Sequence, residues 1–232
     1  MQLIDANKAQ TGLTIVAQSQ TGGKGQRGKI WVDTPGQSLL MSVITTPGLP
    51  IGAQFAFNAL IAVTIANVLQ KLCSTPDIRI KWPNDIIIND KKAGGILIEN
   101  VLRGSRWTHC VIGLGINVKQ EQFPAALPFA TSLKIALGQH INMIRLRDDL
   151  RMEIVDCSNC PVPSEISMER YNQYLYKRGQ KQRFSDSSGQ WEATILGADA
   201  DGRLQVQLAD GNIVFYQHGQ VVWEWGVLPL RR

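Results

Sequence analysis

Cysteine is scarce in this 232-residue sequence, and charge of one sign never accumulates in a long run. The four cysteines, Cys73, Cys110, Cys157 and Cys160, are too few and too scattered for the disulfide framework of a small secreted domain. Cys157 and Cys160 have CxxC spacing, but no second pair and no histidine at zinc-finger spacing accompanies them. We therefore expect incidental thiols. No block of five or more like charges suggests a nucleic-acid-binding tail.

Targeting and membrane signals are missing as well. The segment Met1–Asp5 has no cationic region followed by an apolar core, and the apolar stretch near residues 55–72 carries Asn58, Thr64 and Asn67. We expect a cytoplasmic protein without a membrane span. The composition, with 44% hydrophobic and 19% charged residues, is that of a globular protein, and its net charge of +5 suits acidic or phosphorylated partners.

The apolar patterns predict two domains. Residues 1–178 suit an α/β (α+β) domain, with a mixed, largely antiparallel sheet and helices packed on one side. In it we expect strands at 13–18 (buried), 38–45, 78–81, 86–88, 95–99 and 108–118, and helices at 1–10, 51–72, 131–138, 144–157 and 165–177. Residues 179–232 contain five short β runs, at 182–185, 190–198, 203–208, 213–217 and 220–225, joined by turns that include Asp-Gly. This spacing predicts a small C-terminal SH3-like β-barrel.

Glycine and positive charge are concentrated in the stretch Gln20–Trp31, directly after a predicted strand. Its glycines let the backbone come close to a ligand, and Lys24, Arg27 and Lys29 add positive charge. A phosphate, carboxylate or acyl phosphate would suit this stretch. A solvated, flexible basic hairpin is the alternative.

Two nucleotide-binding patterns are only partly matched. Gly23–Lys29 begins like a P-loop, but Ile30 stands where magnesium binding needs Ser or Thr, and no helix is predicted next. Gly113–Val118 fails the dinucleotide pattern, because Val118 occupies the third glycine position. Glycines inside a strand indicate instead that something approaches the backbone closely, and Asn117 could bind an amide or a base edge.

A second group of polar residues, Lys81–Asp85, lies between two apolar strands. A hairpin turn at Asn89–Asp90 would bring Lys92 back alongside Asp85. The small residues Ala93–Gly95 would let a ligand lie against the backbone. The alternatives are a core tryptophan beside a simple turn, and an exposed hairpin lysine.

Taken in order, four motifs closely resemble those of the biotin protein ligases: QTGGKGQRGKIW (20–31), KWPND (81–85), KKAGGILIE (91–99) and GLGINV (113–118). The resemblance is strong over residues 1–140 and looser from residue 179. It implies the fold shared by class II aminoacyl-tRNA synthetases and biotinyl/lipoyl transferases. It also implies biotin–[acetyl-CoA-carboxylase] ligase activity: biotin and MgATP give biotinyl-5′-AMP, and a lysine of a biotin carboxyl carrier protein or domain then takes the biotin.

The resemblance also implies roles for individual residues. Lys92 would touch the biotin carboxylate and then the adenylate, Asp85 would orient Lys92 or the metal and could accept a proton from the incoming amine, and Arg27 would neutralise phosphate. The expected biotin and adenylate site is Gln20, Gly23, Lys24, Gly25, Gln26, Arg27, Lys29, Trp31, Lys81, Asn84, Lys92, Gly94, Gly95, Gly115 and Asn117. No metal ligands are indicated.

The chain departs from the family pattern in two places. The Ser-Thr-Asn segment that usually contributes to the biotin pocket is absent, so the chain is expected to begin midway through the following helix. Gln26 stands where many members have arginine. No DNA-binding helix-turn-helix is present, and we expect no DNA partner.

Two other functions are open. A lipoate or octanoate ligase or transferase would use a similar fold and chemistry, although the tryptophans of the first two motifs favour biotin. A basic nucleic-acid-binding protein would use the cationic stretch and the barrel, but it leaves residues 81–92 unexplained.

Overall fold

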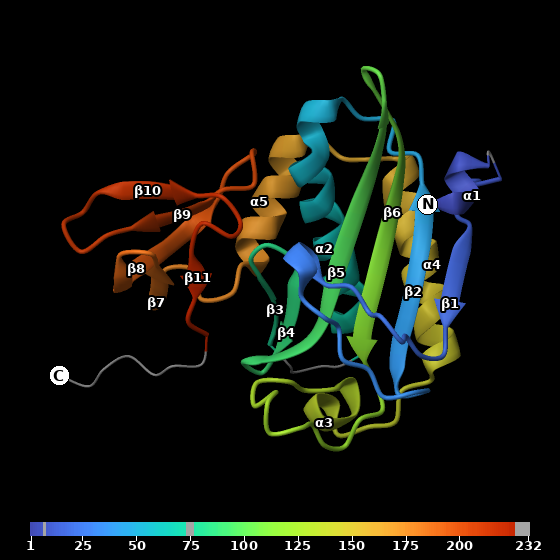
Figure 1. The fold of residues 1–232 in the computed structure, drawn as a ribbon, viewed down its shortest axis with the longest axis horizontal. Coiled ribbons are helices and arrows are strands. Elements are labelled where there is room, and N and C mark those ends of the chain that lie inside the picture. The colour runs from blue at the N-terminus through green and yellow to red at the C-terminus, as the bar shows by residue number, and fades with distance from the viewer. Residues whose placement is uncertain (7, 73–76, 226–232) are drawn as a thin grey trace.

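The protein, seen here as a computed structural model, is described for residues 1–6, 8–72 and 77–225. Two antiparallel sheets lie side by side (Figure 1). The first sheet has six strands in the order β1-β2-β6-β5-β4-β3, and the second has five in the order β10-β9-β8-β7-β11.

The elements follow the predicted sequence order closely. The first sheet consists of β1 (Thr14–Ala17), β2 (Ser38–Thr45), β3 (Ile78–Lys81), β4 (Asp85–Ile88), β5 (Lys91–Arg103) and β6 (Arg106–Asn117). The helices are α1 (Gln2–Asp5), α2 (Gln54–Gln70), α3 (Leu133–Leu137), α4 (Met143–Asn159) and α5 (Ser164–Tyr174), with 3-10 turns at Gln26–Gly28 and Ile51–Ala53. The second sheet consists of β7 (Lys181–Asp186), β8 (Gly189–Ala198), β9 (Leu204–Gln207), β10 (Ile213–Tyr216) and β11 (Val222–Trp223).

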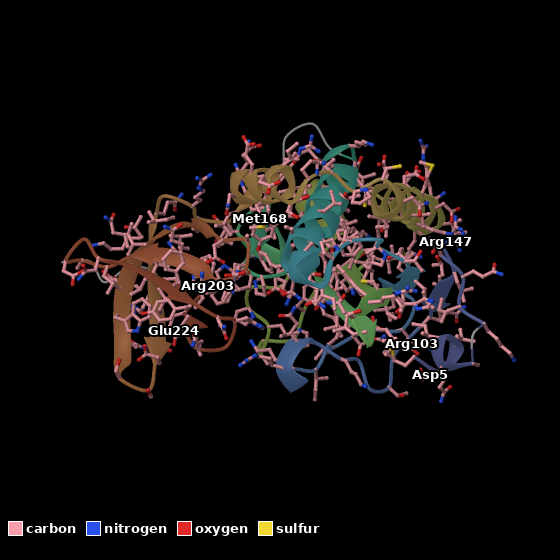
Figure 2. The ribbon with its side chains drawn as sticks, turned by 90° about the horizontal axis from the view of Figure 1, so that it is seen from above. Asp5, Arg103, Arg147, Met168, Arg203 and Glu224 are labelled. Atoms are coloured by element: carbon pink, nitrogen blue, oxygen red, sulfur yellow. The ribbon has the colours of Figure 1, made fainter. Side chains whose placement is uncertain are left out.

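One face of the first sheet packs against helices and the other face stays open. Figure 2, seen from above, shows α2, α4 and α5 as a layer on one side of the sheet. Because side chains alternate along a strand, β6 directs Ile112, Leu114 and Ile116 into this core and leaves Gly113 and Gly115 on the open face. The open face is therefore where a ligand can reach the backbone.

Helix α2 forms the centre of the helical layer. Its alanines and branched apolar residues are buried on most sides, because it packs on the sheet and on both α4 and α5. Residues Ile51–Gln70 are long and apolar enough to span a membrane by length and composition, but 61% of their most apolar window is buried inside the molecule. The helix thus has the burial of a core helix.

Several predicted boundaries differ from the structure. Helix α1 ends at Asp5 instead of continuing to residue 10, because Gly12 already donates a backbone hydrogen bond to β2. Helix α5 ends at Tyr174 instead of 177, because Tyr176 donates its backbone N–H to β3. Strand β5 begins before and ends after the predicted 95–99. Strand β11 is only two residues long.

The prediction of a buried first strand was wrong. Strand β1 pairs only with β2, so it forms an edge of the sheet, and Ile15 and Val16 are 49% and 48% exposed. Cys110, Cys157 and Cys160 are free thiols, as expected, and Cys73 lies outside the described residues.

Candidate active site

The floor of the candidate site is the backbone of β5 and β6. Gly95 and Gly115 are directly paired across these strands on the open face. The indole of Trp31 lies over them: a Cβ added to Gly115 would come within 2.8 Å of Trp31 Cε2. Glycine is therefore required at position 115 for the tryptophan to reach the sheet.

The cationic stretch folds into a compact hairpin above this floor. Lys24 and Ile30 form an antiparallel bridge, and the Trp31 N–H donates to the Gly23 carbonyl at 3.0 Å. A Cβ on Gly23 would lie 2.6 Å from the Trp31 carbonyl oxygen, so the close approach needs glycine. The alternative of a freely solvated loop does not describe this geometry. Lys24 and Lys29 of this hairpin line a cavity over the sheet.

Lys92 and Asp85 form an ion pair beside the glycine floor, with 2.6 Å between Lys92 Nζ and Asp85 Oδ1. The pair arises from the β4–β5 hairpin, whose turn residues Asn89 and Asp90 adopt left-handed φ values of 50° and 61°. A register shift at Ile86/Ile87 then places Asp85 opposite Gly95. The expectation that the hairpin brings these two charges together is confirmed.

A cavity of about 380 Å³ lies between the cationic hairpin and the sheet. Four lysines and His218 line it together with two carboxylates, Asp85 and Glu99. Met41, Leu97 and Val111 are among its apolar lining residues. The predicted residues in its wall are Gln20, Lys24, Gly25, Gln26, Lys29, Trp31, Lys81, Asn84, Asp85, Lys92, Gly95 and Gly115. The cavity thus suits an anionic ligand that also carries apolar groups.

A second cavity of about 250 Å³ adjoins the first. Trp31 and Lys92 line both, so they mark the boundary between them. Its wall is largely aromatic and apolar, with Phe123, Phe129 and Trp225. A flat apolar ring system would fit there.

Several predicted site residues have other contacts. Asn84 donates its amide to the Ile96 carbonyl, and Asn117, which lines the second cavity, donates to the Thr131 carbonyl at 3.0 Å. Arg27 lines neither of the two cavities. Gly23 and Gly94 are also outside both walls, because they serve close backbone approaches.

Lys81 links the site to the second sheet. Its Nζ lies 4.8 Å from the ring centroid of Trp223 and 5.7 Å from that of Trp225. Burial, opposed by Asp85, lowers the Lys81 pKa from 10.5 to about 8. Lys81 is thus the lysine of this cavity whose charge changes just above neutral pH.

The sequence motifs indicate none of the contributions that the second sheet makes to the site. Trp82 donates its indole N–H to the Gly202 carbonyl at 2.9 Å, and its ring meets His218 edge to face at 5.5 Å. His218 and Trp225 line the first and the second cavity, respectively. Motif spacing could not find them, because only the docking of the two sheets brings them to the site.

Within the described residues, no group of three or more His, Cys, Asp and Glu side chains is arranged to hold a metal ion. Two polar atoms in the cavity wall are buried without a hydrogen-bond partner, Gln26 Oε1 and Trp31 Nε1. One accepts and the other donates, so both can be satisfied by a polar ligand.

The fold and site define an α/β protein with a cationic, small-molecule cavity over a glycine floor. Residues 2–117, half of the chain, match the sequence model of the biotin/lipoate A/B protein ligase family. The chain belongs to that family.

Individual relatives agree with this assignment. The chain is 31% identical over 227 residues to the bifunctional ligase/repressor BirA of Bacillus subtilis, covering 97% of this chain and 63% of that protein. It is 28% identical to the human biotin–protein ligase, over 92% of this chain and 31% of that protein. The chain thus spans less than two thirds of the length of both.

The fold also matches solved structures. Biotin protein ligase from Aquifex aeolicus in complex with biotin and ATP superimposes with a TM-score of 0.75 at 20% identity, covering 92% of this chain and 89% of that one. This likeness establishes the mixed α/β fold with antiparallel sheets.

Proposed function

We propose that the protein is an ATP-dependent biotin protein ligase. It would join biotin to AMP and then pass the biotin to a lysine of a biotin carboxyl carrier protein or domain. The observation that carries this proposal is the Lys92–Asp85 pair, 2.6 Å apart, beside a glycine floor in a cavity lined by three further lysines. The human relative, whose name is biotin–protein ligase, favours biotin over lipoate or octanoate.

The geometry suits the first half-reaction. The biotin carboxylate and the ATP phosphate are both anionic, so fixed cations must offset their repulsion before they can react. Lys92 would contact the carboxylate, and Lys24 and Lys29 would contact phosphate oxygens. Asp85 holds Lys92 in position. The apolar lining residues of the main cavity would contact the rings of biotin, and the aromatic cavity would take adenine.

Magnesium would enter with ATP. The cavity offers Asp85 as a carboxylate, and Mg²⁺ is commonly held by one or two carboxylates together with substrate phosphates. Asp85 fits that mode of binding. The ion would offset phosphate charge.

We also infer that residues 1–178 form the catalytic domain and residues 179–232 an SH3-like domain. The continuous antiparallel order of the five strands β7 to β11 supports this division. We place the protein in the cytoplasm, where its carrier partners would be.

The test measures the exchange of labelled pyrophosphate into ATP in the presence of biotin, lipoate or octanoate, each assayed separately as the carboxylic acid substrate. Exchange with biotin alone is expected, followed by labelling of a biotin carrier domain. Exchange with lipoate or octanoate in place of biotin would assign the protein to the other branch of its family. Absence of exchange with all three acids would overturn the ligase proposal.

A further inference from the structure

The second sheet supplies one titratable side chain to the main cavity, His218. It lies in the turn after β10, which is closed by hydrogen bonds between Gln217 and Gln220 in both directions. The imidazole is half-buried and packs edge to face on Trp82, with 5.5 Å between ring centroids. A short closed turn and an aromatic wall thus fix His218 in the wall of the main cavity.

The second half-reaction needs a group that accepts a proton. An acceptor lysine arrives as an ammonium ion, and only the neutral amine can attack an acyl carbon. A lysine that carries its proton cannot accept another, and the pKa of Lys81, lowered to about 8 by burial, leaves this side chain mostly protonated at neutral pH.

The two carboxylates are poorly placed for the task. Asp85 is already bonded to Lys92 at 2.6 Å. Asp85 pairs with Gly95 of β5, and Glu99 lies four residues further along the same strand. The backbone of Glu99 is therefore about 13 Å from the residue that Asp85 faces. His218 is the remaining basic side chain in the wall of this cavity among the described residues.

The charges facing His218 keep its imidazole neutral when no anion is bound. Burial lowers the His218 pKa below 6.5, and Arg27 and Lys29 of the cationic hairpin and Lys81 of β3 lower it further, against the opposing effect of Asp85. An adenylate phosphate in the cavity would offset those cations. The imidazole would then become more basic at the stage when an amine must be deprotonated.

We propose that His218 accepts the proton of the attacking lysine in the transfer step. This inference rests on the ligase function proposed above. The ammonium gives one proton to an imidazole nitrogen, and the free amine attacks the acyl carbon of the adenylate. The new C–N bond forms, the bond from the acyl carbon to the phosphate oxygen breaks, and AMP leaves with the bonding electron pair. The second nitrogen proton passes to water, and the imidazolium releases its proton to solvent.

The test separates the two half-reactions in single turnovers. Wild-type protein and the variants His218→Gln and His140→Gln are first loaded with biotin and MgATP, and adenylate formation is measured. Each loaded protein is then mixed with Nα-acetyl-lysine amide or with hydroxylamine, which is already unprotonated at neutral pH. His140 is exposed and remote from the main cavity, so it serves as the matched control.

His218→Gln is expected to slow transfer to the lysine amine about 100-fold, the usual contribution of a general base, with little effect on transfer to hydroxylamine. The wild-type rate with lysine should rise with pH until the imidazole is neutral and then level off, whereas the variant depends on the free amine alone, so its rate should keep rising through neutral pH. Equal losses with both amines, or no loss with either, would overturn the inference. If wild-type protein forms no biotinyl adenylate, the ligase proposal itself fails, and this inference fails with it.

Discussion

At the scale of single residues, Lys92 combines every feature of a charge-stabilising group. It is paired with Asp85, it borders both cavities, and its Nζ lies 5.9 Å from the ring centroid of Trp31. Its side chain is 32% exposed, so a ligand can reach it. Lys91, the preceding residue on the same strand, is exposed and lines neither cavity.

Lys92→Ala is expected to reduce adenylate formation about 100-fold or more, the size associated with removing one preorganised donor from an enclosed site. Pyrophosphate exchange measures this loss. Lys91→Ala should retain activity close to wild type, and both variants should unfold at similar urea concentrations. Near-normal exchange by Lys92→Ala would contradict the assigned role.

The sequence could predict the Lys92–Asp85 pair because a two-residue turn fixes which residues of a hairpin lie opposite each other. It could not show that the side-chain amides of Asn84 and Asn117 bind backbone carbonyls of their own chain. The same motif is compatible with an amide that faces a ligand and with an amide that bonds to the backbone. Only the surrounding backbone decides between a ligand contact and a structural hydrogen bond.

At the scale of elements, helix α5 supports the turn between β3 and β4. Tyr171 is fully buried, and its hydroxyl donates to the Pro83 carbonyl at 2.9 Å. Burial raises the pKa of this hydroxyl well above its usual value, so it remains a donor at all relevant pH values. The helix thereby anchors the segment that carries Asn84 and Asp85.

Tyr171→Phe should lower the free energy of unfolding by about 1–3 kcal/mol, because it leaves the partly buried Pro83 carbonyl without this donor. Urea unfolding measures the change. Tyr174→Phe on the same helix is the matched control, since Tyr174 loses only a bond to Asn67 near the surface and should cost less. A larger loss for Tyr174→Phe would show that α5 does not anchor the turn through Tyr171.

Strand and helix positions were largely predictable, because apolar periodicity and turn residues act locally. Strand β2 has the predicted bounds, Ser38–Thr45. The exposure of β1 was not predictable, because a short apolar strand looks the same in the centre of a sheet and at its edge. Neighbours distant in the sequence decide which of the two it becomes.

At the scale of the whole molecule, the two sheets meet at the site. Trp223 and Trp225 hold the Lys81 ammonium, while Gly219 lies against Arg27 of the cationic hairpin. A Cβ on Gly219 would lie only 1.7 Å from the Arg27 guanidinium. Sequence motifs carry no information on such docking, so this part of the site was found only in three dimensions.

Lys81 should make stability depend on pH. Its pKa is 10.5 when unperturbed and about 8 in the folded protein, so between these values the unfolded chain binds more protons. The free energy of unfolding therefore gains a contribution that rises with pH across this window and is absent below it. Lys81→Met should lack this rise.

The measurement is urea unfolding at about pH 7 and about pH 9.5, which bracket the lower part of the transition. Lys181→Met, which changes an exposed lysine at the start of β7, is the control and should keep the wild-type pH dependence. Identical pH dependence in wild type and Lys81→Met would mean that Lys81 is not perturbed by its burial.

The glycine floor under Trp31 also constrains how this protein can evolve. Its shape comes from the backbone pairing of Gly95 with Gly115, so drift in the side chains around it leaves the floor unchanged. Any side chain at position 115 would collide with the indole, which removes small adaptive steps there. A lineage that acquires a new acid substrate would therefore have to remodel the cavity walls or replace Trp31, while the floor is inherited intact.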